Sequence, residues 1–341
     1  MDNVRDIAKE DFHNQKNNDD KIKFLLRYAV LAPSTHNSQP WLFRVGDGSC
    51  QISYDKDLLL SEVDPLERDL YISLGCMVEN LILAAKYFGV FKNVEYFFEN
   101  ELVGEIFFDF SSEKEADKKT EHLLDAMLVR NNVRGKFDVG DIDENITSEI
   151  VDSYQKEYLG DGQINFIRQK DNIGKIAKLT AKGMQLAHSQ KIFRSEMSNW
   201  INNNLSRKKD GIPGYTMEMP TLLSFIVPKM VKYFNLGKIL GKKNYSSLKT
   251  APLITVLSTE ENNYKNWVNI GRMTERIFLE FTAKNIKSSI FVASIEMGDL
   301  YKDLQKVIGT DFIPQFLFVS GYKNKKQKYS LRHPVEDKLI K

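Results

Sequence analysis

The chain has 341 residues, 42% hydrophobic and 28% charged, which is enough to bury a core and excludes both disorder and a disulfide scaffold as explanations of its stability. Its 48 basic and 46 acidic residues nearly cancel, so no overall field favours a nucleic-acid partner. Two cysteines, a polar amino terminus without a signal-like stretch, and no run of roughly 18 apolar residues predict a cytoplasmic protein with no membrane partner.

The first part of the chain alternates helical and strand patterns. In chain order it predicts a helix, two strands, a long buried helix and a further strand pair, at residues 21–32, 41–45, 50–55, 68–88, 94–98 and 105–110. The charged run 113–119 follows and is the best candidate boundary inside the chain. It divides the chain into a first half, 1–118, and a second half, 119–341.

The second half begins with helical patterns and ends with a strand. In chain order it predicts helix, helix, strand, mainly helix, strand, helix and strand, at residues 120–130, 147–158, 164–168, 172–204, 253–258, 267–283 and 316–322. Residues 207–245 stand apart, because a loop with Gly and Pro leads into a stretch rich in Met and Phe and then into lysines.

The two long helices share a weak internal repeat with an offset of 196 residues. Each has a glycine, a glutamate four positions later and a leucine four positions after that: Gly75, Glu79 and Leu83, then Gly271, Glu275 and Leu279. Two interpretations stay open. Two buried helices share the pattern by chance, or a duplicated α/β unit packs its long helices at a pseudo-two-fold axis.

Residues 32–41, APSTHNSQPW, form a polar loop between a helix and a strand. Pro33 ends the helix and Pro40 fixes the entry into the strand. Hydroxyl, amide and backbone groups follow closely, which suits a planar ligand edged with heteroatoms. The alternative is a generic surface loop. We expect His36 to be exposed, and we assign no catalytic residue.

Residues 130–134, RNNVR, place two guanidinium groups four positions apart. Arg130 and Arg134 can then grip a phosphate with several charge-assisted hydrogen bonds. The alternative is an ordinary solvated basic turn.

Both segments resemble motifs of the FMN-dependent nitroreductase family. The loop is similar to the family's signature loop, which implies FMN ribityl or ring contacts from Pro33, Ser34, Thr35, Asn37 and Gln39. RNNVR is similar to the family's amino-terminal arginine motif, which implies FMN phosphate contacts from Arg130, Asn132 and Arg134.

Two later segments extend the resemblance. Gly321-Tyr322 followed by RHPVE is similar to the family's carboxyl terminus, which implies that Arg332 reaches the phosphate. Ser330 departs from the family, where a basic residue is common. SIEMG occupies the place where the family lines the flavin ring, often with a backbone N–H, which implies Ile295 and Glu296. A surface role is the alternative for Glu296.

The resemblance implies an α+β, nitroreductase-like fold with mixed or antiparallel sheets flanked by helices. The loop occurs only in the first half and the arginines only in the second. This asymmetry resembles the single-chain Acg-like subgroup, an intramolecular pseudo-dimer with one complete site. A monomer is therefore expected.

The same subgroup implies that the insertion 207–245 is a lid over the flavin. Its apolar cover would come from Met217, Met219, Leu222, Phe225 and Ile226. An ordinary core helix is one alternative, and an amphipathic surface anchor that uses the nearby lysines is another.

The resemblance implies hydride transfer from NADPH or NADH to FMN, and then to a small-molecule acceptor of the nitroaromatic or quinone-like kind. The rival hypothesis is a non-catalytic FMN-storage protein whose lid blocks hydride donors, and a weaker one is a fold without flavin. No Gly-x-Gly-x-x-Gly pattern supports a separate Rossmann domain, and no His-rich spacing predicts a metal.

Overall fold

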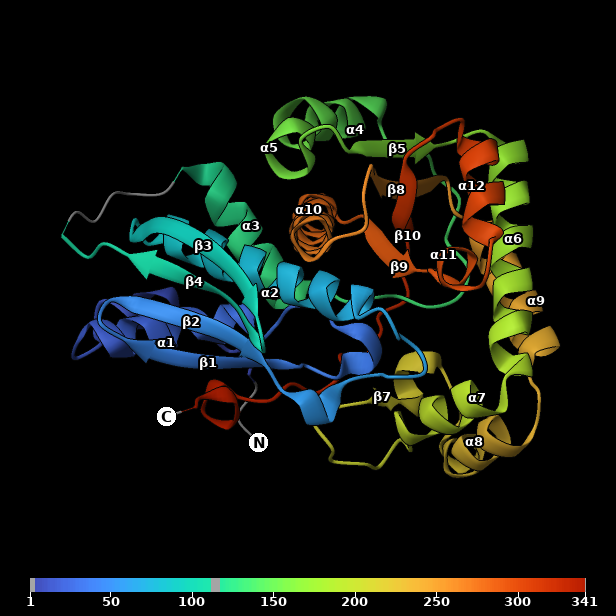
Figure 1. The fold of residues 1–341 in the computed structure, drawn as a ribbon, viewed down its shortest axis with the longest axis horizontal. Helices are drawn as coiled ribbons and strands as arrows, with labels where there is room; N and C mark the ends of the chain where they lie inside the picture. The colour runs from blue at the N-terminus through green and yellow to red at the C-terminus, as the bar shows by residue number, and fades with distance from the viewer. Residues whose placement is uncertain (1–3, 112–116, 341) are drawn as a thin grey trace.

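The computed structural model describes residues 4–111 and 117–340. It contains two four-stranded antiparallel sheets flanked by helices. Two long helices, α2 (Arg68–Tyr87) and α10 (Tyr264–Ala283), pack against each other between the sheets (Figure 1). The predicted α+β class with antiparallel sheets is confirmed.

The first half forms one sheet in the order β1-β2-β4-β3. Its elements besides α2 are α1 (Asn18–Ala29), β1 (Trp41–Gly46), β2 (Ser49–Tyr54), β3 (Phe91–Glu99) and β4 (Leu102–Phe108). Helix α3 (Lys118–Val129) follows and opens the second half, where a helix is predicted at 120–130. Every element predicted here is confirmed to within a few residues. The proposed boundary at 113–119 lies mostly outside the described residues, so the division of the chain stays a prediction.

The second half forms the other sheet in the order β5-β8-β10-β9. Its strands are β5 (Gln163–Ile167), β8 (Leu253–Thr259), β9 (Lys287–Ile290) and β10 (Ile313–Gly321). Its other helices are α4 (Glu144–Ile150), a π-helical turn (Val151–Gln155), α5 (Lys156–Leu159), α6 (Lys170–Ser189), α7 (Lys191–Asn199), α8 (Thr221–Tyr233), α9 (Gly237–Leu248), α11 (Ala293–Glu296) and α12 (Leu300–Ile308). The sequence did not predict β9, α11 or α12.

The two sheets follow one plan. In each, the strands are ordered first, second, fourth, third along the chain, and the long helix follows the second strand. The helices cross where Gly75 and Gly271 face each other. A Cβ on Gly75 would collide with the Val268 carbonyl oxygen, and one on Gly271 with that of Ile72. Val268 follows Ile72 by the same 196 residues, so the repeat marks the centre of a repeated architecture.

Helix α2 forms the centre of the core. By length and composition this helix could cross a membrane, although no such run is predicted above, but 89% of its apolar window is buried inside the fold. Its fully buried side chains include Leu74 and Met77. Its burial is explained by packing against α10, α1 and α3.

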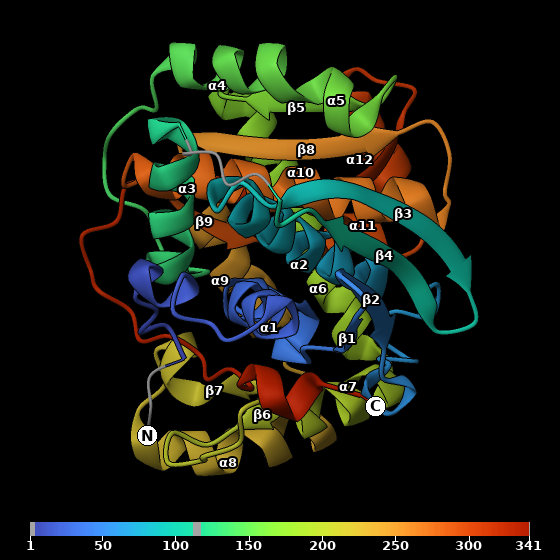
Figure 2. The same ribbon diagram turned by 90° about the vertical axis from the view of Figure 1, so that its left-hand side faces the viewer.

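The carboxyl-terminal segment returns to the first half. Figure 2 shows this segment, in red, running past α1 toward β1. The Ile340 amide donates to the Phe43 carbonyl at 2.8 Å, and Leu339 forms a parallel bridge with Phe43. A segment that follows the second sheet therefore borders the first one, beside the polar loop.

Candidate functional site

The loop after α1 is held in an unusual backbone conformation. His36, Asn37 and Gln39 all have positive φ, at 52°, 58° and 51°. Such conformations are costly for residues with a Cβ and persist only where surrounding contacts enforce them. The Ser34 hydroxyl enforces one of them by accepting from the Gln39 amide at 2.9 Å. The loop is thus a shaped element and not a generic connection.

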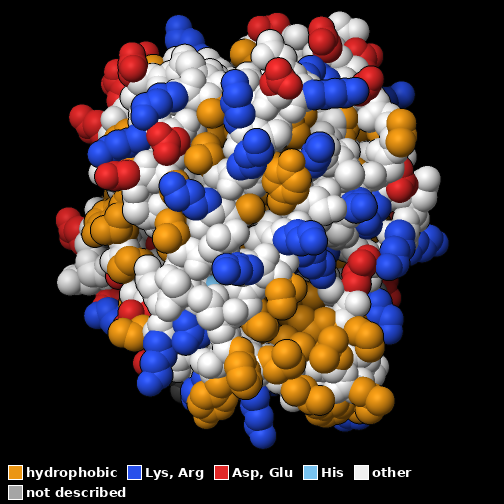
Figure 3. Space-filling model, turned by 90° about the vertical axis from the view of Figure 1, so that its right-hand side faces the viewer, with side chains coloured by type: hydrophobic (Ala, Val, Ile, Leu, Met, Phe, Trp, Pro, Cys, Tyr) orange, Lys and Arg blue, Asp and Glu red, His pale blue; other side chains and the backbone are white. Residues whose placement is uncertain are grey.

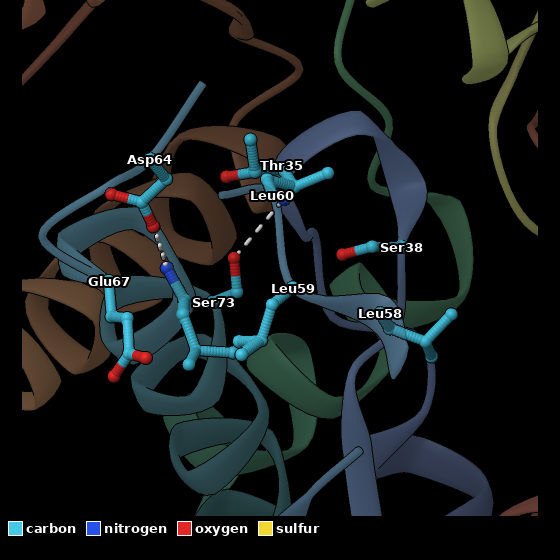
Figure 4. Close-up of a pocket in the computed structure, with 9 residues that line it drawn as sticks. Thr35, Ser38, Leu58, Leu59, Leu60, Asp64, Glu67 and Ser73 are labelled. Carbon is cyan, nitrogen blue, oxygen red and sulfur yellow. Dashed lines mark hydrogen bonds between the residues drawn. The ribbon is translucent and has the colours of Figure 1, made fainter. Parts of the chain in front are cut away.

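A polar joint fixes this loop to the start of α2 (Figure 4). The Thr35 amide donates to the Ser73 hydroxyl at 3.1 Å. Beside it, Asp64 accepts from the Leu70 amide at 2.8 Å and so caps the first turn of α2. The cavity between them is about 10 Å³, room for about one water. A cavity of this size is too small for a nucleotide, so the hydrogen bonds around it serve to position the loop.

Asn37 brings the loop into direct contact with Arg332. Its side-chain oxygen accepts from the Arg332 guanidinium, and its NH₂ donates to the carbonyls of Lys209 and Leu331 at 3.0 and 3.2 Å. Gln39 acts in parallel, because it also donates to the Lys209 carbonyl, at 2.8 Å. The two predicted groups, loop and carboxyl-terminal arginine, therefore lie together.

Arg130 joins the same region from the end of α3. It is buried, donates to the Leu31 carbonyl at 3.0 Å, and has its Nε 3.2 Å from Glu275 Oε1 without hydrogen-bond alignment. Arg332 is also buried and donates to the Ala32 carbonyl at 3.2 Å. Both arginines thus bind the carbonyls at the end of the first helix, from opposite ends of the second half.

This cluster carries more positive than negative charge. Arg5, Arg130 and Arg332 all lie near Glu275, the one carboxylate that the described residues place between Arg130 and Arg332. Burial and the neighbouring Arg130 lower the pKa of Arg5 to about 10, and burial lowers the pKa of Arg332 well below its ordinary value. Among the residues that the structure describes, the Nε atoms of Arg130 and Arg332 find no hydrogen-bond partner. A bound anion would relieve this excess. Arg5 was not among the predicted site residues.

Arg134 adds a guanidinium whose side chain has no hydrogen bond or ion pair with any residue that the structure describes. Its backbone is fixed by Gln327, which binds the amide and the carbonyl at 3.0 and 3.1 Å. Burial lowers its pKa. Burial also lowers the pKa of His36 to about 4, and Arg134 contributes to that shift, so the two lie near each other. The expected exposure of His36 is wrong: the side chain is half-buried, and its Nδ1 has no hydrogen-bond partner within residues 4–111 and 117–340.

Three other predicted positions have structural partners. The Asn132 oxygen accepts from the Ile290 amide at 3.2 Å and ties the arginine segment to β9. The amides of Ile295 and Glu296 both donate to the Val292 carbonyl, at 2.7 and 3.2 Å. Neither amide is free in this conformation for the expected role of a donor facing the flavin ring.

Glu296 is not the surface group of the alternative interpretation. It lies 3.7 Å from Arg68, and burial with the neighbouring Asp69 raises its pKa well above the ordinary value. Arg68 also contacts Asp69 at 3.3 Å. These groups form a half-buried polar cluster at the start of α2, next to the joint that positions the loop.

The insertion 207–245 divides into two parts. Its beginning packs on the loop, since the Gly211 amide donates to the Asn37 carbonyl at 3.3 Å. In α8, by contrast, the expected cover is turned away, because Leu222, Phe225 and Ile226 are exposed. The core-helix alternative is wrong for the same reason. The first part can cover the site, and α8 in this structure does not.

No family model matches the chain. Two curated proteins of Mycobacterium tuberculosis, each named "Putative NAD(P)H nitroreductase", are similar to parts of it. The one called acg is 35% identical over 122 residues, which are 35% of this chain and 36% of that protein. The nitroreductase resemblance is confirmed over this stretch. The one called Rv3131 is 35% identical over 68 residues, 20% of each protein. The match spans about a third of the length of the first relative.

Solved structures are similar to a larger share of the chain at lower identity. A BluB-like flavoprotein from Clostridium difficile 630 covers 63% of this chain with 96% of its own, at 15% identity and a TM-score of 0.41. The FMN-dependent nitroreductase NfnB from Mycobacterium smegmatis, solved in complex with NADPH, covers 61% with 90% of its own, at 12% identity and a TM-score of 0.37. TM-scores at this level are too low to establish a shared fold.

Proposed function

We propose that the chain binds FMN between the loop at 33–39 and the arginines of the second half. The observation that carries this proposal is an excess of cations at one place. Among the described residues, the buried Arg130 and Arg332 face one buried carboxylate, Glu275, and the side chain of Arg134 has no partner. The FMN phosphate is the anion that would balance this charge, held by Arg130, Arg134 and Arg332. Asn132 would position the arginine segment 130–134 through its hydrogen bond to β9.

The loop would meet the ribityl chain and the ring. Its predicted contact residues are Pro33, Ser34, Thr35, Asn37 and Gln39. Its amides are now engaged by Arg332 and the Lys209 carbonyl, so binding of FMN would exchange some of those bonds for bonds to the ligand. Positive φ at three positions already sets the shape of this loop before the ligand arrives.

We further infer an oxidoreductase activity of the nitroreductase type, with NADPH or NADH as donor and a nitroaromatic or quinone-like acceptor. FMN, when bound, supplies the hydride and electron chemistry. The chain binds and orients it, and no side chain is assigned as nucleophile or general base. The names of the M. tuberculosis relatives support this class of activity.

The test begins with the purified protein. Bound flavin should give a yellow preparation that releases FMN when denatured. Mixing with NADPH or NADH without oxygen should bleach the flavin absorbance within seconds, and a nitroaromatic or quinone should restore it. A colourless protein that binds no added FMN contradicts the cofactor. Bound FMN that never bleaches contradicts the enzyme and leaves the storage hypothesis.

A further inference from the structure

Helix α8 docks through one face, with Ser224, Val227 and Val231 buried or half-buried, and leaves a second apolar face exposed. Within it, only Ser224 and Val231 are buried. The Ser224 hydroxyl accepts from the Asn204 amide at 2.9 Å and donates to the Thr221 carbonyl at 2.6 Å. A helix on a water-exposed surface normally has polar side chains on its outward face, and α8 does not.

The exposed side is large and continues into α9. The side chains and their exposed fractions are Leu222 84%, Leu223 42%, Phe225 48%, Ile226 55%, Tyr233 68%, Phe234 63% and Ile239 69%. Figure 3 shows the resulting orange patch at the lower right of the face, with lysines and arginines around it. We call these seven residues the α8 patch. An apolar surface of this extent, rimmed by charge, marks an interaction site.

The segment that carries the α8 patch is basic. From Met219 to Thr259 the sequence has no Asp or Glu and six lysines, all exposed: Lys229, Lys232, Lys238, Lys242, Lys243 and Lys249. Among the residues that the structure describes, none of the six forms an ion pair. The neighbouring α6 has no acidic residue after Asp171. In α7, Glu196 accepts from the amides of Glu62 and Val63, at 3.0 and 2.7 Å.

A basic concavity borders the α8 patch and shares Ile239 with it. Its volume is about 420 Å³, and its lining is Gly135, Lys136, Ile239, Lys242, Lys243, Ser246 and Ser247. Ammonium and hydroxyl groups in this arrangement suit a phosphate headgroup. Exposed apolar side chains next to a cationic hollow are the features with which proteins bind an anionic lipid surface.

We propose that the α8 patch docks on an anionic lipid bilayer. The apolar side chains enter the boundary between headgroups and acyl chains, and the lysines lie over acidic headgroups. A second copy of the chain fits less well, because a symmetric contact would place the six lysines of one copy against those of the other. This assignment revises the expectation of no membrane partner and takes up the surface-anchor alternative for the insertion.

The experiment is flotation of the full chain with vesicles. Phosphatidylcholine vesicles are compared with phosphatidylcholine vesicles that contain phosphatidylglycerol. We expect binding only to the anionic vesicles at about 0.1 M salt, and its loss at about 1 M, where charges are screened within about 3 Å. The double substitutions F225S/I226S and K242E/K243E should each weaken binding by about ten-fold or more.

Matched controls are L66S and K302E/K306E. Leu66 is exposed outside the α8 patch, and Lys302 and Lys306 are exposed on α12. These controls should float like the unaltered protein. The proposal is overturned if the chain floats with neither kind of vesicle, or if the controls lose binding as much as the α8 patch variants. It is also overturned if sedimentation shows a dimer that F225S/I226S dissociates, because a second copy then covers this surface.

Discussion

The two glutamates of the repeated helices lie in opposite environments. Glu79 is buried and accepts from Arg272, Arg276 and Tyr158 at 3.1, 3.1 and 2.6 Å. Burial alone would raise the pKa of Glu79, but Arg276 and Arg272 hold it below its ordinary value. At this end of the helix pair, two arginines neutralise the buried carboxylate, so the cluster is satisfied without a ligand.

At the other end of the helix pair, the carboxylate is not satisfied in this way. Glu275 is equally buried, but neither of its oxygens has a hydrogen-bond partner among the described residues. Burial raises its pKa to about 6, although Arg130 and Arg332 oppose the shift. The positions 196 residues before Arg272 and Arg276 are Cys76 and Asn80, which carry no charge. One structural plan thus holds one satisfied cluster and one unsatisfied cluster, and the unsatisfied one is the proposed FMN phosphate site.

The largest expected effect comes from removing the charge of Glu79, the satisfied carboxylate. The substitution E79Q leaves Arg272 and Arg276 buried without a carboxylate, and the free energy of unfolding should fall by roughly 3–5 kcal/mol. Urea unfolding at neutral pH measures it. The matched substitution E275Q should cost far less. Equal losses at the two positions would show that the two ends are not different.

Substitutions where α2 and α10 cross should lower the free energy of unfolding nearly as much. A methyl group at Gly271 would collide with the Ile72 carbonyl, so G271A should force the helices apart and cost about 3 kcal/mol. The control is G174A in α6, where a Cβ meets nothing within 4 Å. That change should not destabilise, and can add up to about 1 kcal/mol, because alanine is the better helix former. A stable G271A protein would argue against the close crossing.

Binding of FMN tests the proposed phosphate site around Glu275 and Arg134. Because the Arg134 side chain has no partner in the described part of the chain, R134A should leave the melting temperature unchanged. It should weaken FMN binding by about ten- to a hundredfold, the range expected for one lost hydrogen-bonding cation. Fluorescence titration with FMN gives the dissociation constant, with R207A on the surface as the control. Unchanged affinity would remove Arg134 from the proposed phosphate site.

The smallest effect concerns pH. Since the folded protein raises the pKa of Glu275 from its ordinary 4.5 to about 6, the folded state holds its proton more tightly than the unfolded state. Stability without flavin should therefore fall by about 2 kcal/mol as pH rises from about 4.5 to 6. E275Q should remove this decline. Stability curves of the two proteins that remain parallel over this pH range would contradict it.

Local patterns were sufficient for the long elements. The spacing of apolar residues predicted α2 and α10 closely, because a buried helix must be apolar over many turns. The four-residue strand β9 was missed, since its pairing with β10 is a long-range contact that so short a segment does not encode. The repeat at Gly75 and Gly271 was visible, but only the packed helices showed that the two glycines meet.

The candidate site was predictable where motifs were continuous. The loop at 33–39 and Arg332 were expected to converge, and Asn37 does contact Arg332. Arg5 has no local motif, because its place in the cluster depends on tertiary contacts. The outward face of α8 was also out of reach, since composition does not tell which side of a helix is docked. The bond between Ser224 and Asn204 decides that.

The return of the carboxyl-terminal segment has a consequence for biosynthesis. Phe43 leaves the ribosome early, but the strand edge that it belongs to gains its neighbour only after Ile340 has been made. During that interval the edge of β1 is open to pairing with other nascent chains. A slow stretch of translation before Ile340 would therefore lengthen the time during which the edge of β1 is unpaired.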